Sequence, residues 1–218
     1  MKQKNICKRT ASGGFTYLYV AALPSHGEIA SLGIPERDAE IAAVSNMRVK
    51  REKYYAWRLL ELAVRDRFGL TLNELGLRRE EYGGWSSEVC ELSVSHTADA
   101  VAVALCDMPV GVDIEEIHLP RASGFAERIM NETEFAEYLL LSECDRTEKL
   151  IRIWTAKEAI FKSQHSPAFI PKDTAVASVP IVTDTLMLGE KKYIWSLAVG
   201  TKASDRTVDV VPICVNLE

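Results

Sequence analysis

The sequence predicts an α+β fold in two halves, and three observations support this: the order of the elements, a long helix in each half, and short apolar runs around the helices. An expected strand is followed by a helix, then by strands, helices and further strands. A chain of 218 residues suits one large domain or two small ones. We place the boundary near Gly111, between residues 1–110 and residues 111–218.

The first half is predicted to begin with a buried strand and to continue into a long helix. The run FTYLYVAAL, Phe15 to Leu23, is too short to span a bilayer. We interpret it as a strand rather than a secretory signal, because two tyrosines interrupt it and no clean small-residue cleavage site follows. Residues 46–68 predict an amphipathic helix. Three strand-like runs follow, at Cys90–His96, Ala100–Cys106 and Pro109–Glu115.

The second half is predicted to contain helices followed by strands. Asn131, with Glu134 three residues later, forms a capping-box pattern at the start of a helix. Residues 147–164 predict a long helix. Further strands are expected near Thr174–Val179, Tyr193–Val199 and Val208–Val215.

The composition is that of an ordinary globular protein, with 47% hydrophobic and 26% charged residues. A formal net charge of -5 argues against nucleic-acid binding, which needs a basic face. The cysteines are odd in number and none forms a CxxC pair, so we expect reduced core thiols in a cytoplasmic protein without a membrane span. These cysteines are Cys7, Cys90, Cys106, Cys144 and Cys214.

Two carboxylates share one face of the strand expected within GVDIEEI, residues 111–117. Alternate residues of a strand point the same way, so Asp113 and Glu115 face together while Val112 and Ile114 face the core. A hard divalent cation such as Mg²⁺ prefers such an oxygen environment. The alternative is a strand that leaves the core with a solvated acidic end.

The segment WTAKEAIFK, residues 154–162, supplies a third carboxylate and two lysines. Glu158 and Lys162 are four residues apart and share a helix face. If this helix crosses the acidic strand end, Glu158 completes a metal site, and Lys157 and Lys162 can neutralise phosphate oxygens. The alternative is an ordinary surface salt bridge between Glu158 and Lys162.

A third segment, ELSVSHT, ends a predicted strand with Ser95 and His96. Neighbours in sequence do not form a nucleophilic pair, which also needs an orienting acid and an exposed serine. No GxSxG motif occurs, and no P-loop pattern GxxxxGK[ST] either. Serine-hydrolase and P-loop kinase chemistry are therefore unfavoured.

In order and spacing, the segments SVSHT, GVDIEEI, RIMNETEF and WTAKEAIFK resemble the 4′-phosphopantetheinyl transferases. The resemblance is to the larger monomeric type, which activates carrier proteins of peptide and polyketide synthases. It covers residues 93–162, about a third of the chain. It implies two similar α+β halves with pseudo-twofold symmetry and an active site, with coenzyme A, in the cleft between them.

The resemblance also implies roles for the acidic and basic residues. Asp113, Glu115 and Glu158 would hold Mg²⁺, which would also bind the pyrophosphate of coenzyme A. Lys157 and Lys162 would contact phosphate oxygens. Catalysis would then depend mainly on alignment and charge neutralisation.

Other positions are assigned to the nucleotide and to proton transfer. Ser95 and His96 would lie near the nucleotide, with His96 on the 3′-phosphate. Glu134 would be the candidate general base, with helix capping as its alternative role. The family's arginine on the first long helix is assigned to Arg58, with Arg51, Lys50 and Lys53 as the other candidates.

The reaction implied is transfer of 4′-phosphopantetheine from coenzyme A to a serine of an apo acyl or peptidyl carrier protein. The chain departs from the family at EYGGWSSEV, where a Gly-Lys-Pro segment is common, so one basic contact is missing or supplied elsewhere. A coenzyme A or nucleotide-binding protein without transferase activity is the main alternative. A different magnesium phosphoryl enzyme, or an interaction protein with a solvated acidic strand end, are the others.

Overall fold

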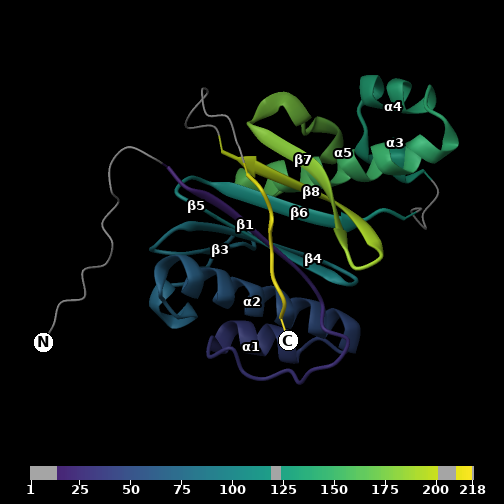
Figure 1. Ribbon diagram of the computed structural model, residues 1–218. Helices are drawn as coiled ribbons and strands as arrows, with labels where there is room; N and C mark the ends of the chain where they lie inside the picture. Colours follow the sequence, from purple (N-terminus) through teal and green to yellow (C-terminus); the bar gives the residue numbers. More distant parts are fainter. Residues whose placement is uncertain (1–13, 119–123, 201–209, 218) are drawn as a thin grey trace, which may run out of the picture.

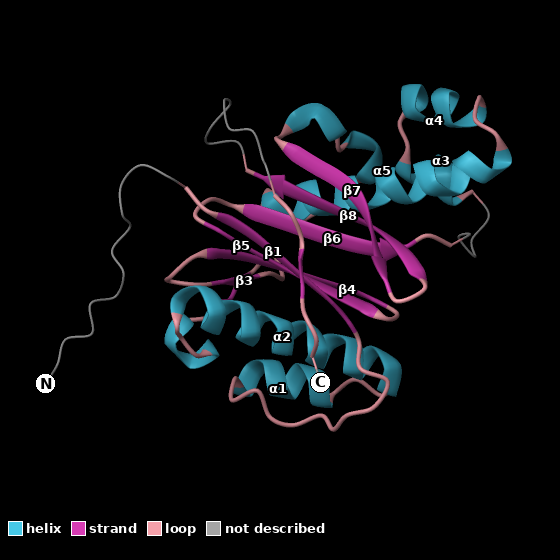
Figure 2. Ribbon diagram, in the orientation of Figure 1, coloured by secondary structure: helices cyan, strands magenta, loops and turns pink. Residues whose placement is uncertain are grey.

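The computed structural model describes residues 14–118, 124–200 and 210–217, which form two sheets between two helical layers (Figures 1 and 2). Cys7 lies outside these residues. Helix α2 covers one sheet and α1 packs against α2, whereas α3 to α5 lie beyond the other sheet. The mixed helix and strand content confirms the predicted α+β class, whereas the boundary near Gly111 stays a prediction.

The first sheet has the strand order β4-β5-β1-β9, with β1 antiparallel to β5 and parallel to β9. Its predicted strands are confirmed to within one residue, and β9 is a short pair within the range expected at Val208–Val215, of which residues 208 and 209 lie outside the described part. The strand bounds are β1 Thr16–Ala22, β4 Glu91–Thr97, β5 Ala100–Cys106 and β9 Ile213–Cys214. A separate ribbon pairs β2 Arg78–Arg79 with β3 Trp85–Ser86.

The second sheet has the order β6-β8-β7, and both pairings are antiparallel. The strand predicted at Thr174–Val179 is wrong, because this segment contains a 3-10 turn at Val176–Ser178. Its Ala and Val residues indicated a strand, but the alternating run begins only after Pro180. The strand bounds are β6 Val110–Glu116, β7 Ile181–Leu188 and β8 Lys191–Val199.

Each long helix covers one sheet. In α2, the cap residue Asn46 accepts hydrogen bonds from two backbone N–H groups, and Gly69 ends the helix with φ 65°. In α5, the start lies earlier than predicted because Ser142 caps it. The long helices are α2 Met47–Phe68 and α5 Glu143–Ser163; the shorter ones are α1 Pro35–Ala42, α3 Phe125–Ile129 and α4 Glu132–Leu139, with 3-10 turns at Leu72–Leu75 and Pro171–Asp173.

The two faces of the first sheet belong to two different hydrophobic cores. In β5, Val101, Val103 and Leu105 pack against α2, whereas Ala102 and Ala104 pack against the second sheet. The result is four layers: α2, first sheet, second sheet and α5. The described part of the chain holds no helix with the length and apolar character of a membrane span.

Candidate functional site

Asp113 of β6 lies where the two sheets and α5 meet, and it is only 4% exposed. Its Oδ1 accepts hydrogen bonds from the Ser95 hydroxyl at 2.7 Å and from Lys162 Nζ at 2.8 Å. Its Oδ2 is buried and has no hydrogen-bond partner within the described residues. The carboxylate therefore keeps one acceptor oxygen unused in an enclosed position.

Lys162 joins α5 to this carboxylate. Its Nζ lies 3.5 Å from Glu158 Oε2 and also donates to the carbonyl of Val112 at 3.2 Å. Burial lowers the pKa of Lys162, but the carboxylates of Asp113 and Glu158 outweigh that effect and raise it above its ordinary value. Lys162 is therefore a firmly charged cation between two acids.

Glu115 and Glu158 carry the rest of the negative charge. Burial, followed by the nearby Asp113, raises the pKa of Glu115 to about 7, although the Thr97 hydroxyl donates to its Oε2 at 2.9 Å. Burial also raises the pKa of Glu158, against the lowering effect of Lys162. Both shifts show that the surroundings disfavour further negative charge.

A close approach of α5 to β6 makes this arrangement possible. A Cβ added to Gly111 would lie 1.9 Å from the carbonyl oxygen of Ala159 and 2.6 Å from Ser163 N. Only glycine leaves room for the helix at this position. The face of α5 that bears Glu158 and Lys162 therefore reaches the strand that bears Asp113.

The predicted carboxylates are thus brought into one region, with Lys162 among them. As they stand, no three His, Cys, Asp or Glu side chains of the described ranges form a group that could hold a metal ion. Asp113 and Glu158 both contact Lys162 rather than each other. The metal role of Asp113, Glu115 and Glu158 therefore stays a prediction.

Lys157 and Glu134 form a second, separate cluster. Lys157 is fully buried, and its Nζ donates to the carbonyls of Ile129 and Pro171, each at 2.8 Å, and to Glu134 Oε2 at 2.6 Å. Because three acceptors match its three donors, Lys157 holds α5 against its surroundings and has no donor left for a phosphate here. The predicted phosphate contact of Lys157 is not part of this arrangement.

Glu134 also confirms the capping box. Its Oε2 accepts from the backbone N–H of Asn131, and its own N–H donates to Asn131 Oδ1, both at 2.9 Å. The cap and the ion pair with Lys157 both use Oε2 of this carboxyl group. The general-base role of Glu134 stays a prediction.

His96 points to the other face of β4, toward α2. Burial, with the positive charges of Lys162, Arg37 and Lys53, lowers the pKa of His96 to about 4. The ring is therefore neutral at physiological pH. A groove of about 490 Å³ lies beside it, lined among others by Arg48, Glu52 and His118.

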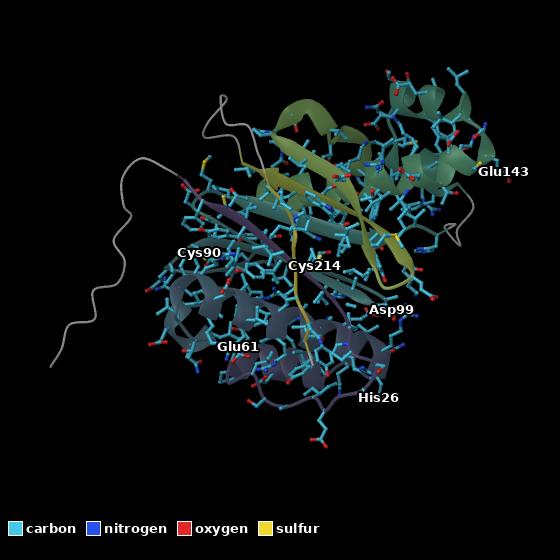
Figure 3. The ribbon with its side chains drawn as sticks, in the orientation of Figure 1. His26, Glu61, Cys90, Asp99, Glu143 and Cys214 are labelled. Carbon is cyan, nitrogen blue, oxygen red and sulfur yellow. The ribbon has the colours of Figure 1, made fainter. Side chains whose placement is uncertain are left out.

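The basic residues near this ring differ from the one assigned by sequence. Arg58 is exposed and pairs with Glu61, which Figure 3 labels on α2. Lys53 was one of the alternatives, whereas Arg37 was missed. The available signal was Pro35, which favours a helix start and would have placed Arg37 in the first turn.

An ion-pair bridge ties the two sheets together at the end that carries the site. Lys191 of β8 contacts Asp99, labelled in Figure 3 at the β4–β5 turn, and Glu116 of β6 at 3.1 Å. Thr97 and Glu115, which are hydrogen-bonded to each other, lie one or two residues away along these strands. The bridge therefore links the two hairpin ends beside the carboxylate cluster.

Comparison with known proteins gives a consistent result. Residues 109–203 match the family model of the 4′-phosphopantetheinyl transferase superfamily, so the match includes β6, α5 and β8. The chain is 24% identical over 53% of its length to the 4′-phosphopantetheinyl transferase ffp of Bacillus subtilis. It is 27% identical over 38% of its length to Sfp of Bacillus subtilis strain 168, and 39% identical over 32% to psf-1 of Bacillus pumilus, both also named 4′-phosphopantetheinyl transferases.

The aligned stretches cover 53%, 36% and 30% of those three proteins, so the chain spans about half of their length or less. The family match contains Asp113, Glu115, Glu158 and Lys162, the residues that converge between β6 and α5. Residues 109–203 of this chain are thus similar to the 4′-phosphopantetheinyl transferase superfamily.

Proposed function

We propose that this chain transfers the 4′-phosphopantetheine group of coenzyme A to a serine hydroxyl of an apo acyl or peptidyl carrier protein. The observation that carries the proposal is the contact of Lys162 with both Asp113 and Glu158, inside the segment that matches the superfamily. The protein would act as a cytoplasmic monomer. Coenzyme A would bind between two halves related by pseudo-twofold symmetry.

The donor atoms of the cluster are of the type that a divalent cation prefers, although in the described residues the three carboxylates do not form a metal-holding group as they stand. Three carboxylates, those of Asp113, Glu115 and Glu158, influence one another around a single ammonium group. The enclosed Oδ2 of Asp113 has no partner within the described residues, and carboxylate oxygens are the ligands that Mg²⁺ prefers. These three residues would hold the ion, which when bound polarises the phosphate oxygens of the substrate.

The chain's own residues would position the substrate and compensate its charge. Lys162 would place a fixed positive charge beside the β-phosphate while negative charge develops there. The serine oxygen forms a bond to the β-phosphorus as the bond from that phosphorus to the bridging oxygen breaks. Adenosine 3′,5′-bisphosphate leaves with that oxygen, and Glu134 is the candidate acceptor of the serine proton.

The test is the gain in mass of a carrier protein. The full chain is incubated with coenzyme A, Mg²⁺ and a panel of apo acyl and peptidyl carriers, and Asp113→Ala is assayed beside it. We expect wild type to add one phosphopantetheine group and Asp113→Ala to lose nearly all transfer, because a proposed metal ligand in the middle of β6 is lost. Glu61→Gln, which alters a partly exposed carboxylate of α2, serves as the control.

Two outcomes would contradict the proposal. No mass gain on any carrier, together with calorimetric binding of coenzyme A, would favour the binding protein without transferase activity. Full transfer by Asp113→Ala would remove this cluster from the chemistry.

A further inference from the structure

A buried carboxylate on α2 faces the imidazole of His96, and the proposed reaction gives it no role. Glu52 is only 8% exposed. Its Oε1 accepts from Arg48 Nε at 3.1 Å, and its Oε2 lies 3.4 Å from Nδ1 of His96. The two oxygens of Glu52 thus face different partners.

The ion pair with Arg48 does not account for the burial of Glu52. The side chain of Arg48 is 64% exposed, whereas that of Glu52 is 10% exposed. Solvent-exposed pairs with this spacing stabilise a helix only weakly, whereas an enclosed carboxylate needs strong hydrogen-bond donors. A second donor would therefore stabilise the Glu52 carboxylate.

His96 supplies a nitrogen with the complementary need. Nδ1 of His96 is buried and makes no hydrogen bond as placed among the described residues, although it faces Glu52 Oε2. A proton on Nδ1 would satisfy both groups with a small rotation of the ring. A neutral imidazole carries a single proton, so Nε2 would then be left without one.

We propose that Glu52 is a positioning residue that fixes the proton of His96 on Nδ1 and turns Nε2 toward the neighbouring groove. The groove of about 490 Å³ is lined by both Glu52 and His96. What this placement of the His96 proton means for the ligand rests on the proposed function. A phosphate oxygen of coenzyme A can be hydrogen-bonded by Nε2 only after Nε2 gains a proton, so binding takes up a proton.

The charges around the His96 ring set its affinity for a second proton. Positive groups on three elements oppose it, and Glu52 and Asp113 favour it as counter-charges. Glu52 is the carboxylate that faces Nδ1, so its removal lets the neutral ring carry its proton on Nε2 instead. The groups concerned are Glu52 and Lys53 of α2, Arg37 of α1, Lys162 of α5, Asp113 of β6, and His118 beside the groove.

The first test does not depend on any catalytic activity. Nitrogen-15 spectra of histidine-labelled full-length protein distinguish the two neutral tautomers, and the chain has only four histidines, so a His96→Gln spectrum assigns the signal. We expect the Nδ1–H form in wild type and in Glu52→Gln, whose amide oxygen still accepts, and a shift toward Nε2–H in Glu52→Ala. The same tautomer in wild type and Glu52→Ala would overturn the proposal.

The second test measures proton uptake when coenzyme A binds. Calorimetry near pH 7 in two buffers with different heats of ionisation should give close to one proton for wild type, and a loss of most of it for Glu52→Ala. Coenzyme A that lacks its 3′-phosphate should show none in any variant. Equal uptake in Glu52→Ala, or with the dephosphorylated ligand, would overturn the assignment.

Two controls keep both tests interpretable. Glu61→Gln, which changes a partly exposed carboxylate of the same helix, should behave as wild type. If Glu52→Ala does not fold, Glu52→Met fills the space without an acceptor and takes its place. If the protein does not modify carriers but shows the tautomer change, the assignment of Glu52 holds. Only the proposed reaction is then contradicted.

Discussion

The two sheets share one connectivity but differ in chemistry. In each, a strand leads through a long helix to an antiparallel hairpin, and the last strand of the hairpin lies in the middle of the three: β5 between β1 and β4, and β8 between β6 and β7. The buried face of α2 is mainly apolar, as at Leu59 and Leu60. The buried face of α5 includes Thr155, Lys157 and Ser163.

The difference teaches where a scaffold of this kind can carry polar groups. In the first sheet, strand β1 has the buried run Leu18 to Ala21. In the second sheet, the corresponding strand β6 carries Asp113 and Glu115. The corresponding strand thus forms core in one sheet and the candidate site in the other. The following predictions test that division, beginning with the largest expected effect.

Replacing Lys162 with Ala should lower the rate of transfer by about 100-fold or more, because a preorganised charge beside the reacting phosphate is lost. The binding of coenzyme A, measured by calorimetry, should weaken as well. Lys149→Ala is the matched control, since Lys149 lies on the same helix and pairs at 3.6 Å with the exposed Glu137. Equal rates for the two variants would mean that the Lys162 contacts are an ordinary ion pair.

Replacing Lys157 with Met should unfold the protein more easily without changing the KM for coenzyme A. Removing one partner of a buried ion pair typically costs about 3–5 kcal/mol, because Glu134 is left without its cation. For a chain of this size, that lowers Tm by roughly 10 °C. A large rise in KM at unchanged Tm would instead restore the phosphate contact expected from the sequence.

Replacing Gly111 with Ala should separate α5 from β6. The new Cβ would meet backbone atoms of Ala159 and Ser163, which cannot turn away, so we expect a loss of about 1–3 kcal/mol in the free energy of unfolding and a fall in transfer. In Gly84→Ala the added Cβ would meet the ring of Tyr82, a side chain that can turn. Denaturant unfolding of both variants measures the difference; equal stability would show that α5 has room to shift.

Local patterns predicted the elements whose signals lie within a few residues. The apolar run Ala100–Cys106 is β5 with the same bounds, and the Asn131–Glu134 pattern is an observed capping box. Helix α1 was missed because half of Pro35–Ala42 is charged and no side chain caps its start. Strand β7 was missed because its Val and Thr residues alternate only from Ile181 onward, after a stretch of similar composition.

The candidate site was only partly predictable, for a different reason. Sequence spacing placed Asp113 and Glu115 on one strand face and put Glu158 beside Lys162 on a helix, and the structure brings these segments together. The contacts of Lys157 depend on the carbonyls of Ile129 and Pro171, which are distant in the chain. Such long-range partners leave no mark in local spacing, so a buried structural lysine and a phosphate-binding one look alike in sequence.

The smallest expected effect concerns His96, which lies on the α2 side of the first sheet. Its pKa is lowered to about 4 in the folded chain from an ordinary value near 6.5, chiefly by burial, so the unfolded chain binds a proton in this range that the folded chain does not. Stability should therefore fall as the pH drops from about 6.5 to 4.

In His96→Gln this part of the stability loss should disappear, which makes the fall in Tm on acidification smaller by a few degrees. If His96→Gln and wild type lose Tm in parallel, the burial of His96 makes no contribution to the acid sensitivity of the chain.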